Sequence, residues 1–366
     1  MPRIILFLCV IITFFSCEDD EEKDLIFEGD LVLSTQLEID EFMDPGFEEV
    51  TGSLRINPAP GSISEITSLE GLSSLKKVEG SLVVLDNNSL QSLEGLDHLE
   101  SVGGNLTISY NEALTDTRSL NNLTSVGNEI LIQINANLSD LNTFENLTDV
   151  QSITINNNSR LHNINGFNKL SSMTGSLKIW SNATLSIIEG FDNLSSIEGD
   201  LDVNSNTVLP NLSAFQGLSS IGGSLILNNN DALSSTAGLS NVSTIGKKLE
   251  ISRNPALTKL EGLNQVPTLS EFLIILSNPV LKDLDGLNGL TSVGNLFIFH
   301  NEALTGINLV NLATITYQLD VKGNSVLTDF CGIQPVIEND FTGIYNVNDN
   351  AYNPTQEDIL EGKCNQ

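Results

Sequence analysis

The sequence predicts an all-β fold in which the chain winds as a parallel β-solenoid of about 13 coils. The first observation is an asparagine that returns every 23 or 24 residues in the frame apolar–x–aliphatic–x–x–Asn–x–x–Leu. The second is the apolar–x–aliphatic step, whose alternation is typical of a strand with one buried face. A fixed period of this length predicts units that bury their apolar faces against their neighbours. The repeated asparagines are Asn87, Asn111, Asn135, Asn158, Asn182, Asn206, Asn230, Asn254, Asn278, Asn301 and Asn324.

The asparagines themselves are expected to form a buried ladder along one edge of the stack. A carboxamide offers two donors and one acceptor, so it can bond the backbone of its own coil and of the next. The alternative is that each asparagine only favours a turn. Apolar columns accompany the ladder, and one of them contains four consecutive phenylalanines, Phe144, Phe167, Phe191 and Phe215, which we expect to stack as an aromatic spine.

The repeat extends upstream of the first ladder asparagine. Leu31-Val32-Leu33 and Leu54-Arg55-Ile56 show the strand step 23 residues apart but lack the asparagine, as atypical terminal coils often do. The segment 57–64, with two prolines and a glycine, is interpreted as an insertion. We therefore place the repeat domain at residues 27–329.

The N-terminus has the pattern of a secretory signal. A basic start is followed by an apolar run from Ile4 to Phe15, which is too short for a membrane span, and then by Ser16 and Cys17. The Ser16-Cys17 step resembles a bacterial lipoprotein box, although the two preceding phenylalanines are bulkier than is usual there. The resemblance implies a signal peptide over residues 1–16 and lipidation of Cys17. An ordinary signal peptide with a free cysteine is the alternative.

An acidic segment follows, and residues 17–26 are expected to form a solvated tether. It resembles the acidic signals that send some Gram-negative lipoproteins to the outer cell face. The resemblance implies an outer-membrane protein that is anchored by lipid and exposed on the cell surface.

The last part of the chain, residues 330–366, breaks the repeat and is interpreted as a cap over the open end of the stack. Cys331 and Cys364 lie in it, and an oxidising envelope favours their pairing as a disulfide. Asn353-Pro354-Thr355 precedes a short predicted helix at 356–360.

The composition argues against several classes of function. With a formal net charge of −31, the surface repels nucleic acid and anionic membranes. The three histidines occupy different positions in distant coils, and no nucleophile elbow, phosphate loop or zinc-protease motif occurs. We therefore expect no enzyme activity, no cofactor and no bound metal. Cationic partners are favoured by the charge.

The outward strand positions are the better candidates for binding. Ile274, Leu276, Phe297 and Phe299 are expected to form one apolar patch with His300 at its edge, and exposed patches of this kind often mark partner sites. Trp180, the one tryptophan of the chain, falls on the same face and could stack on a sugar or a side chain. The alternative is that a turn or the cap covers part of this face.

The whole pattern resembles the receptor L domain, the ligand-binding solenoid of insulin- and growth-factor-receptor ectodomains that also occurs in yeast cell-wall proteins and bacterial surface lipoproteins. Ser68-Leu69-Glu70-Gly71-Leu72 through Leu90 shows it well, and the resemblance covers residues 31–327. It implies a right-handed β-solenoid and a binding role. Leucine-rich repeats share the strand and asparagine, but there the next apolar residue usually falls two positions on, not three.

Three functions are compatible with this sequence. The leading one is a non-catalytic cell-surface lipoprotein that binds an extracellular protein or glycan through the outward face of the solenoid. The alternatives are a structural envelope protein without a discrete ligand and an accessory glycan-binding lipoprotein of a nutrient-uptake system.

Overall fold

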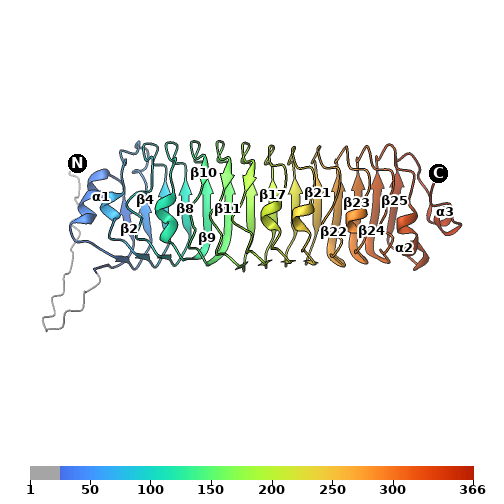
Figure 1. The fold of residues 1–366 in the computed structure, drawn as a ribbon, viewed down its shortest axis with the longest axis horizontal. Coiled ribbons are helices and arrows are strands. Elements are labelled where there is room, and N and C mark those ends of the chain that lie inside the picture. The colour runs from blue at the N-terminus through green and yellow to red at the C-terminus, as the bar shows by residue number, and fades with distance from the viewer. Residues whose placement is uncertain (1–24) are drawn as a thin grey trace, which may run out of the picture.

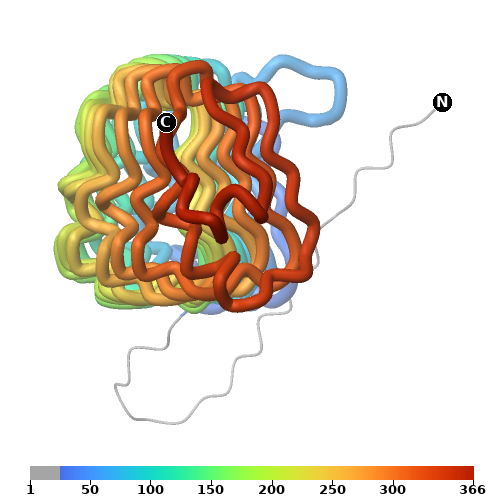
Figure 2. The backbone as a smooth tube through the Cα atoms, turned by 90° about the vertical axis from the view of Figure 1, so that its right-hand side faces the viewer, coloured from blue at the N-terminus to red at the C-terminus, as the bar shows by residue number. Residues whose placement is uncertain are grey.

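The computed structural model describes residues 25–366, and they form one long stack of coils with the two ends of the described chain at opposite ends of the stack (Figure 1). The predicted signal peptide, Cys17 and nearly all of the predicted tether lie outside the described residues. One loop, at 57–64, leaves the stack near its N-terminal end (Figure 2), where the sequence predicted an insertion.

The long face of the solenoid is a continuous parallel sheet. The 18-stranded sheet includes four short strands, β1, β3, β5 and β7, that lie on another side of the coils, which leaves fourteen strands on the long face. Each pairs with the equivalent strand of the next coil, beginning with Leu31 opposite Leu54. These strands are β2 (Leu31–Leu33), β4 (Leu54–Ile56), β6 (Leu82–Leu85), β8 (Leu106–Ser109), β9 (Ser125–Gln133), β11 (Asp149–Asn156), β14 (Leu177–Trp180), β17 (Leu201–Asn204), β19 (Leu225–Asn228), β21 (Leu249–Ser252), β22 (Thr268–Leu276), β23 (Ser292–Phe299), β24 (Thr314–Lys322) and β25 (Ile344–Asn348).

Short strands and turns form the other sides of each coil. Two-residue strands bend into the long face: β1 (Ile26–Phe27), β3 (Glu49–Val50), β5 (Lys77–Val78), β7 (Ser101–Val102), β13 (Ser172–Met173), β16 (Ser196–Ile197), β18 (Ser220–Ile221) and β20 (Thr244–Ile245). A separate three-stranded sheet contains β10 (Asp140–Leu141), β12 (Asn163–Ile164) and β15 (Ile187–Ile188). Single 3-10 turns occupy Glu70–Leu72, Arg118–Asn122, Ser213–Phe215, Ala237–Leu239, Asp285–Leu287 and Cys331–Ile333.

The stack is one coil longer than the sequence predicted. β25 lies inside the segment interpreted as a cap, yet it pairs with β24 in the same parallel register, with Tyr345 opposite Leu319. Asn350 then takes the ladder position of this fourteenth coil, because its Oδ1 accepts from the backbone N–H of Asn324 at 3.0 Å. The true cap is therefore shorter than residues 330–366, and the boundary at 329 and the count of 13 coils are corrected.

Helices cover the two ends of the described stack. The helix α1 (Gln36–Met43), which the sequence analysis did not predict, begins at a capping box formed by Thr35 and Glu38 and buries Ile39 and Phe42. At the other end are α2 (Gln334–Glu338) and α3 (Gln356–Leu360), the latter with its own capping box at Thr355, as the predicted helix start there required. The helices lie at the two ends of the stack, where strand edges would otherwise be exposed (Figure 1).

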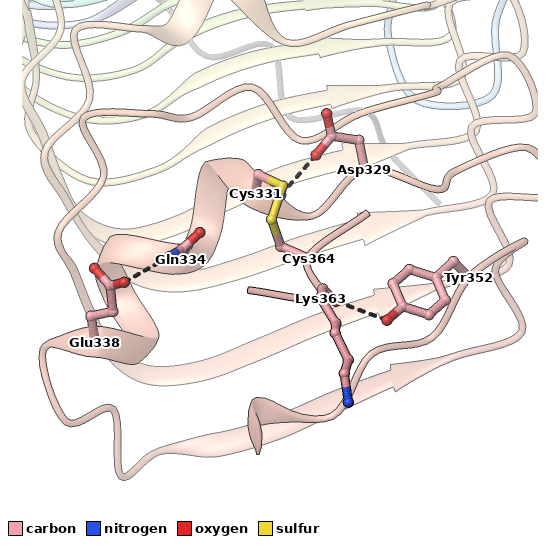
Figure 3. The surroundings of a disulfide bond; sticks show 7 residues. All are labelled: Asp329, Cys331, Gln334, Glu338, Tyr352, Lys363 and Cys364. Atoms are coloured by element: carbon pink, nitrogen blue, oxygen red, sulfur yellow. Dashed lines mark hydrogen bonds between the residues drawn. A yellow bond between two sulfur atoms is a disulfide. The ribbon is translucent and has the colours of Figure 1, made fainter. Parts of the chain in front are cut away.

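A disulfide fixes the C-terminal end. Cys331 and Cys364 are bonded, with Cα atoms 4.8 Å apart and a sequence separation of 33, so the predicted pairing is present (Figure 3). The same segment is held by the hydroxyl of Tyr352, which donates to the carbonyl of Lys363 at 2.8 Å. The backbone N–H of Phe330 also donates to the carbonyl of Cys364.

One apolar core runs through all the coils. The inward leucines, isoleucines and valines of every strand on the long face from β4 to β24 are buried. The predicted aromatic spine is confirmed: the rings of Phe144, Phe167, Phe191 and Phe215 stack in sequence with centroids 5.3, 4.9 and 5.8 Å apart. Offset contacts of this kind add to the burial of apolar area.

The asparagines form the ladder that their spacing predicted. All eleven are fully buried. The backbone N–H of each donates to Oδ1 of the next asparagine at 2.9–3.2 Å. Each Nδ2 donates at 2.8–3.0 Å to the carbonyl of the inward residue one coil earlier. Because every carboxamide bonds both neighbouring coils, the ladder fixes the register of the stack.

The ladder also sustains a strained turn. The residue before each ladder asparagine has a left-handed backbone, and eleven of these twelve positions, counting Asp349, are not glycine; Ile134 at φ +55° and His300 at φ +53° are examples. This conformation costs an L-residue roughly 1–2 kcal/mol. The hydrogen bonds of the adjacent asparagine offset that cost and hold the turn, which ends the strand and aims the following residues inward.

A second column of amides lies on the surface. Its members sit two residues after the Leu/Phe column that contains the aromatic spine, and each Nδ2 donates to a carbonyl of the preceding coil. They are Asn122, Asn146, Asn193, Asn241 and Asn311. Four of these five are exposed, so water competes for the same groups, and this column stabilises the stack less than the buried ladder does.

Candidate functional site

The outward side chains of the long sheet form the face on which binding was predicted. Its composition changes from coil to coil, and several positions are more buried than expected. Although strand alternation directs them outward, five residues each have an exposed fraction of 8% or less: Ser109, Thr154, Asn156, Asp202 and Ser252. Thr154, for example, donates its hydroxyl hydrogen to Glu129 on the preceding strand, β9, at 2.6 Å.

The predicted apolar residues come together on β22 and β23. The strand register places Ile274 opposite Phe297 and Leu276 opposite Phe299, and all four side chains are half-buried on the outward face. The rings of Phe297 and Phe299 lie 5.6 Å apart. A fifth member that was not predicted is Phe272, whose ring centroid is 5.5 Å from that of Phe297.

We call Phe272, Ile274, Leu276, Phe297 and Phe299 the apolar patch. Charged residues flank it on the adjoining strands. On β21, Glu250 lies opposite Ile274 and forms an ion pair with Lys248 at 2.9 Å. On β24, Asp320 lies opposite Phe297 and Lys322 opposite Phe299. An apolar centre with a charged rim is the usual anatomy of a protein-binding surface.

His300 lies at the turn that follows β23, one residue beyond Phe299, and is exposed. Its backbone is left-handed, and its ring lies against Gly323 of the next coil, where an added Cβ would come within 2.5 Å of His300 Nδ1. His300 therefore borders the patch, as expected, but its described contact is with the neighbouring turn.

Trp180 lies on β14, five strands before β23, and at about 4.8 Å per strand it is about 24 Å from the patch. The Nζ of Lys178 lies 5.3 Å from the centre of its ring. The register places Lys178 opposite Asp202 on β17 and Trp180 opposite Asn204. Asn228 on β19 follows Asn204 in the same row. We call Lys178, Trp180, Asp202, Asn204 and Asn228 the Trp180 site.

The Trp180 site holds buried polar atoms without partners. Trp180 Nε1, Asp202 Oδ1 and Asn228 Oδ1 are all shielded from solvent, and none of them forms a well-aligned hydrogen bond. Burial raises the pKa of Asp202 to about 6, and the neighbouring Glu250 and Asp200 carboxylates raise it too. The nearby Trp180 indole N–H and the Lys178 ammonium oppose that rise in the pKa. The indole N–H is thus close to the carboxylate without forming a well-aligned bond to it.

A polar hollow adjoins the Trp180 site. It has a volume of about 330 Å³ and reaches from β9 across β11 to Lys178 on β14. Amide, hydroxyl and carboxylate groups line it almost completely: Asn105, Asn128, Glu129, Gln151, Ser152, Thr154, Ser176 and Lys178. The hollow and the Trp180 site are contiguous through Lys178.

Residues 25–366 contain no group of three or more His, Cys, Asp or Glu side chains placed to hold an ion. Within the same residues, no helix has the length and apolar character needed to cross a bilayer. The two candidate surfaces described above are the apolar patch and the Trp180 site.

Comparison with known proteins places few limits on function. No protein-family model matches the chain, and no curated protein matches it. Among solved structures it is similar to a TLR13–ssRNA13 complex, at 15% identity and a TM-score of 0.30, over 91% of this chain and 53% of that chain. It is also similar to a leucine rich cell surface protein from Faecalibacterium prausnitzii A2-165, at 10% identity and a TM-score of 0.21, over 95% and 98%. The chain thus spans about half the length of the TLR13 chain, and likenesses this distant carry no argument about its ligand.

Proposed function

We propose that this protein is a non-catalytic recognition protein that binds an extracellular protein partner through the outward face of its long sheet. The observation that carries the proposal is the apolar patch: five large apolar side chains, three of them aromatic, grouped on two adjacent strands of a face that is otherwise mostly polar. Half-exposed aromatic clusters of this kind supply most of the binding energy in protein interfaces. The core has no need of them, because the inward side of the same strands is already filled by Leu273, Ile275, Leu296 and Ile298.

The architecture suits this role. A stack whose register is fixed by the buried ladder presents its outward side chains from a rigid support, so binding orders few groups and costs little entropy. The formal net charge of −31 favours a partner whose contact surface is basic around an apolar centre.

The proposal also includes the location of the protein. The basic start, the short apolar run and the Ser16-Cys17 step support export and lipid attachment at Cys17, and the acidic segment after Cys17 supports display at the outer face of a Gram-negative outer membrane. The disulfide between Cys331 and Cys364 is in keeping with an oxidising compartment. The L-domain resemblance supports a binding role of the same kind.

The test compares the chain from Glu18 to Gln366 with its Phe297→Ser/Phe299→Ser variant. Both are immobilised and exposed to a panel of purified extracellular proteins and to whole cells, and the melting temperature of each is measured. The half-buried rings make the variant lose at most about 1–2 kcal/mol of stability, and we expect it to remain folded. Binding seen with the parent chain should be lost.

Tyr317→Ala is the matched control, because Tyr317 is an aromatic residue on the adjoining strand β24 that is 63% exposed and lies outside the patch. Loss of binding in this control as well would show that the patch is not the site. Collapse of the double variant would show that the two rings belong to the core. A parent chain that dimerises while the double variant stays monomeric would replace the external partner by a second copy of this chain.

A further inference from the structure

The Trp180 site has a feature that folding alone does not explain. Three polar atoms from three successive strands, Trp180 Nε1, Asp202 Oδ1 and Asn228 Oδ1, are buried on the outward face without a well-aligned hydrogen bond. Buried polar atoms in native structures are nearly always bonded, because each unbonded one costs about 1–3 kcal/mol. Three such atoms within one patch of the sheet indicate a surface arranged for another molecule.

Asp202 is the clearest case. Leu201 and Val203 on either side point into the core, so the carboxylate of Asp202 belongs to the outward face, where only 8% of the residue is exposed. Its Oδ1 has no well-aligned hydrogen bond, although the Trp180 indole N–H lies close to the carboxylate. Asp200, two residues earlier, accepts from the backbone N–H of Ser224 at 2.7 Å.

The atoms without partners define the chemistry of a ligand. Trp180 Nε1 can only donate, whereas the oxygens of Asp202 and Asn228 accept. A ligand that satisfies all three must both donate and accept at close spacing, and it must present an apolar surface to the half-buried indole ring. Sugar hydroxyls beside a face of C–H groups meet both requirements. We propose that the Trp180 site binds a neutral oligosaccharide, with one sugar residue seated on Trp180 between Asp202 and Asn228.

The polar hollow extends this site. From β9 to β19 the hollow and the Trp180 site cross four strand spacings, about 19 Å, which suits several linked sugars better than one. The carboxylates of Glu129 and Asp202 and the overall negative charge disfavour an acidic saccharide. The proposal does not depend on the apolar patch, which lies on other strands.

Lys178 bears on whether the ligand is a sugar or a cation. Its ammonium lies over the ring of Trp180, with Nζ 5.3 Å from the ring centroid. Its long stem is flexible, so a sugar can take its place over the ring. A cationic ligand would compete for the same position, and its binding would be salt-sensitive.

The experiment uses Trp180 as its own reporter, since the chain contains one tryptophan. The chain from Glu18 to Gln366 is screened by affinity electrophoresis against neutral polysaccharides (mannan, xylan, laminarin and galactan), against polygalacturonate and heparin, and against polylysine. Any positive polysaccharide is then titrated as its oligosaccharide, with tryptophan fluorescence as the readout. We expect at least one neutral polysaccharide to retard the protein, and its oligosaccharide to shift the emission.

The variants assign the site. Trp180→Ala and Asn228→Ala should each weaken retardation about tenfold or more, as expected for residues at the centre of a binding site. Tyr317→Ala and Phe297→Ser/Phe299→Ser should leave it unchanged. Trp180→Phe, which keeps a ring, guards against a folding artefact and should retain part of the affinity.

Three results would overturn the proposal. They are no retardation by any neutral polysaccharide, retardation that persists in folded Trp180→Ala, and binding confined to polylysine. The Phe297→Ser/Phe299→Ser variant is expected to bind saccharide normally, so the two proposals can fail separately. Absence of saccharide binding would leave the proposed protein-binding function untouched. Absence of protein binding would likewise leave the saccharide site untouched.

Discussion

Replacing Asp202 by Asn should stabilise the protein at neutral pH. Oδ1 of Asp202 is buried without a well-aligned hydrogen bond, and burial raises the pKa of this carboxyl from 3.8 to about 6. The folded state therefore holds this proton more tightly than the unfolded state, so stability is greatest when the group is protonated in both and falls as pH rises from about 4 to about 6. Above that range the charge costs about 3 kcal/mol, at 1.36 kcal/mol for each unit of the pKa difference.

The gain in the free energy of unfolding should therefore depend on pH. For Asp202→Asn we expect up to about 3 kcal/mol at pH 8 and only about 1 kcal/mol at pH 4.5, where the folded wild type is already largely protonated. The assay is urea unfolding of both proteins at the two pH values, followed by circular dichroism. Asp200→Asn is the control. The Asp200 carboxylate accepts a hydrogen bond from the N–H of Ser224, so removing its charge should not bring the same gain in stability.

A variant that is no more stable than the wild type at pH 8, or a gain that is equal at both pH values, would refute the reasoning. Either result would mean that the carboxylate is not penalised by burial. If the gain appears together with a loss of saccharide binding, Asp202 is a residue whose cost in stability is retained for function.

Three further predictions concern the scaffold. Asn206→Ala leaves the N–H of Asn182 and the carbonyl of Ile179 without partners, so it should lower the free energy of unfolding by about 2–5 kcal/mol in thermal melts. The control Asn193→Ala, at an exposed amide, should lower it by less than about 1 kcal/mol. Equal effects of the two substitutions would contradict the ladder. Reduction of the Cys331–Cys364 bond should cost about 3–4 kcal/mol and increase proteolysis at the C-terminal end, and a melt unchanged by dithiothreitol would show that the cap is held otherwise. Gly323→Ala should lower stability by roughly 1–2 kcal/mol, because φ is +70° there and His300 fills the space, and an unaltered melt would contradict this packing.

The fold was largely predictable because the signals are local and repeated. The frame from Leu106 to Leu114 contains the strand, the turn and the ladder asparagine of one coil. Ten other coils repeat this frame, so a chance match in any one coil would not alter the predicted fold. The last coil was missed although Tyr345, Val347 and Asn350 keep the frame. Its spacing is 26 residues, and Asn353 stands where the next leucine was expected.

The surface was less predictable. Alternation alone places Phe272 outward beside Leu273, but it lies one alternate position before Ile274, outside the predicted patch, and its ring joins the patch only in the folded sheet. The site at Trp180 depends on side chains from strands 24 residues apart in both directions, and strand register alone does not determine which of them covers Asp202. The carboxylate therefore looked exposed in sequence and is buried in the structure.

Amide hydrogen exchange along the chain is the measurement that tests the stacked architecture most directly. Each ladder asparagine has its backbone N–H buried and bonded to the carboxamide of the next coil, as Asn206 is to Asn230 at 3.1 Å. We expect these amides, throughout the central coils, to be among the slowest in the protein to exchange. Ladder amides that exchange as fast as those of the exposed loop at 57–64 would contradict a continuous interior closed along one edge by bonded asparagines.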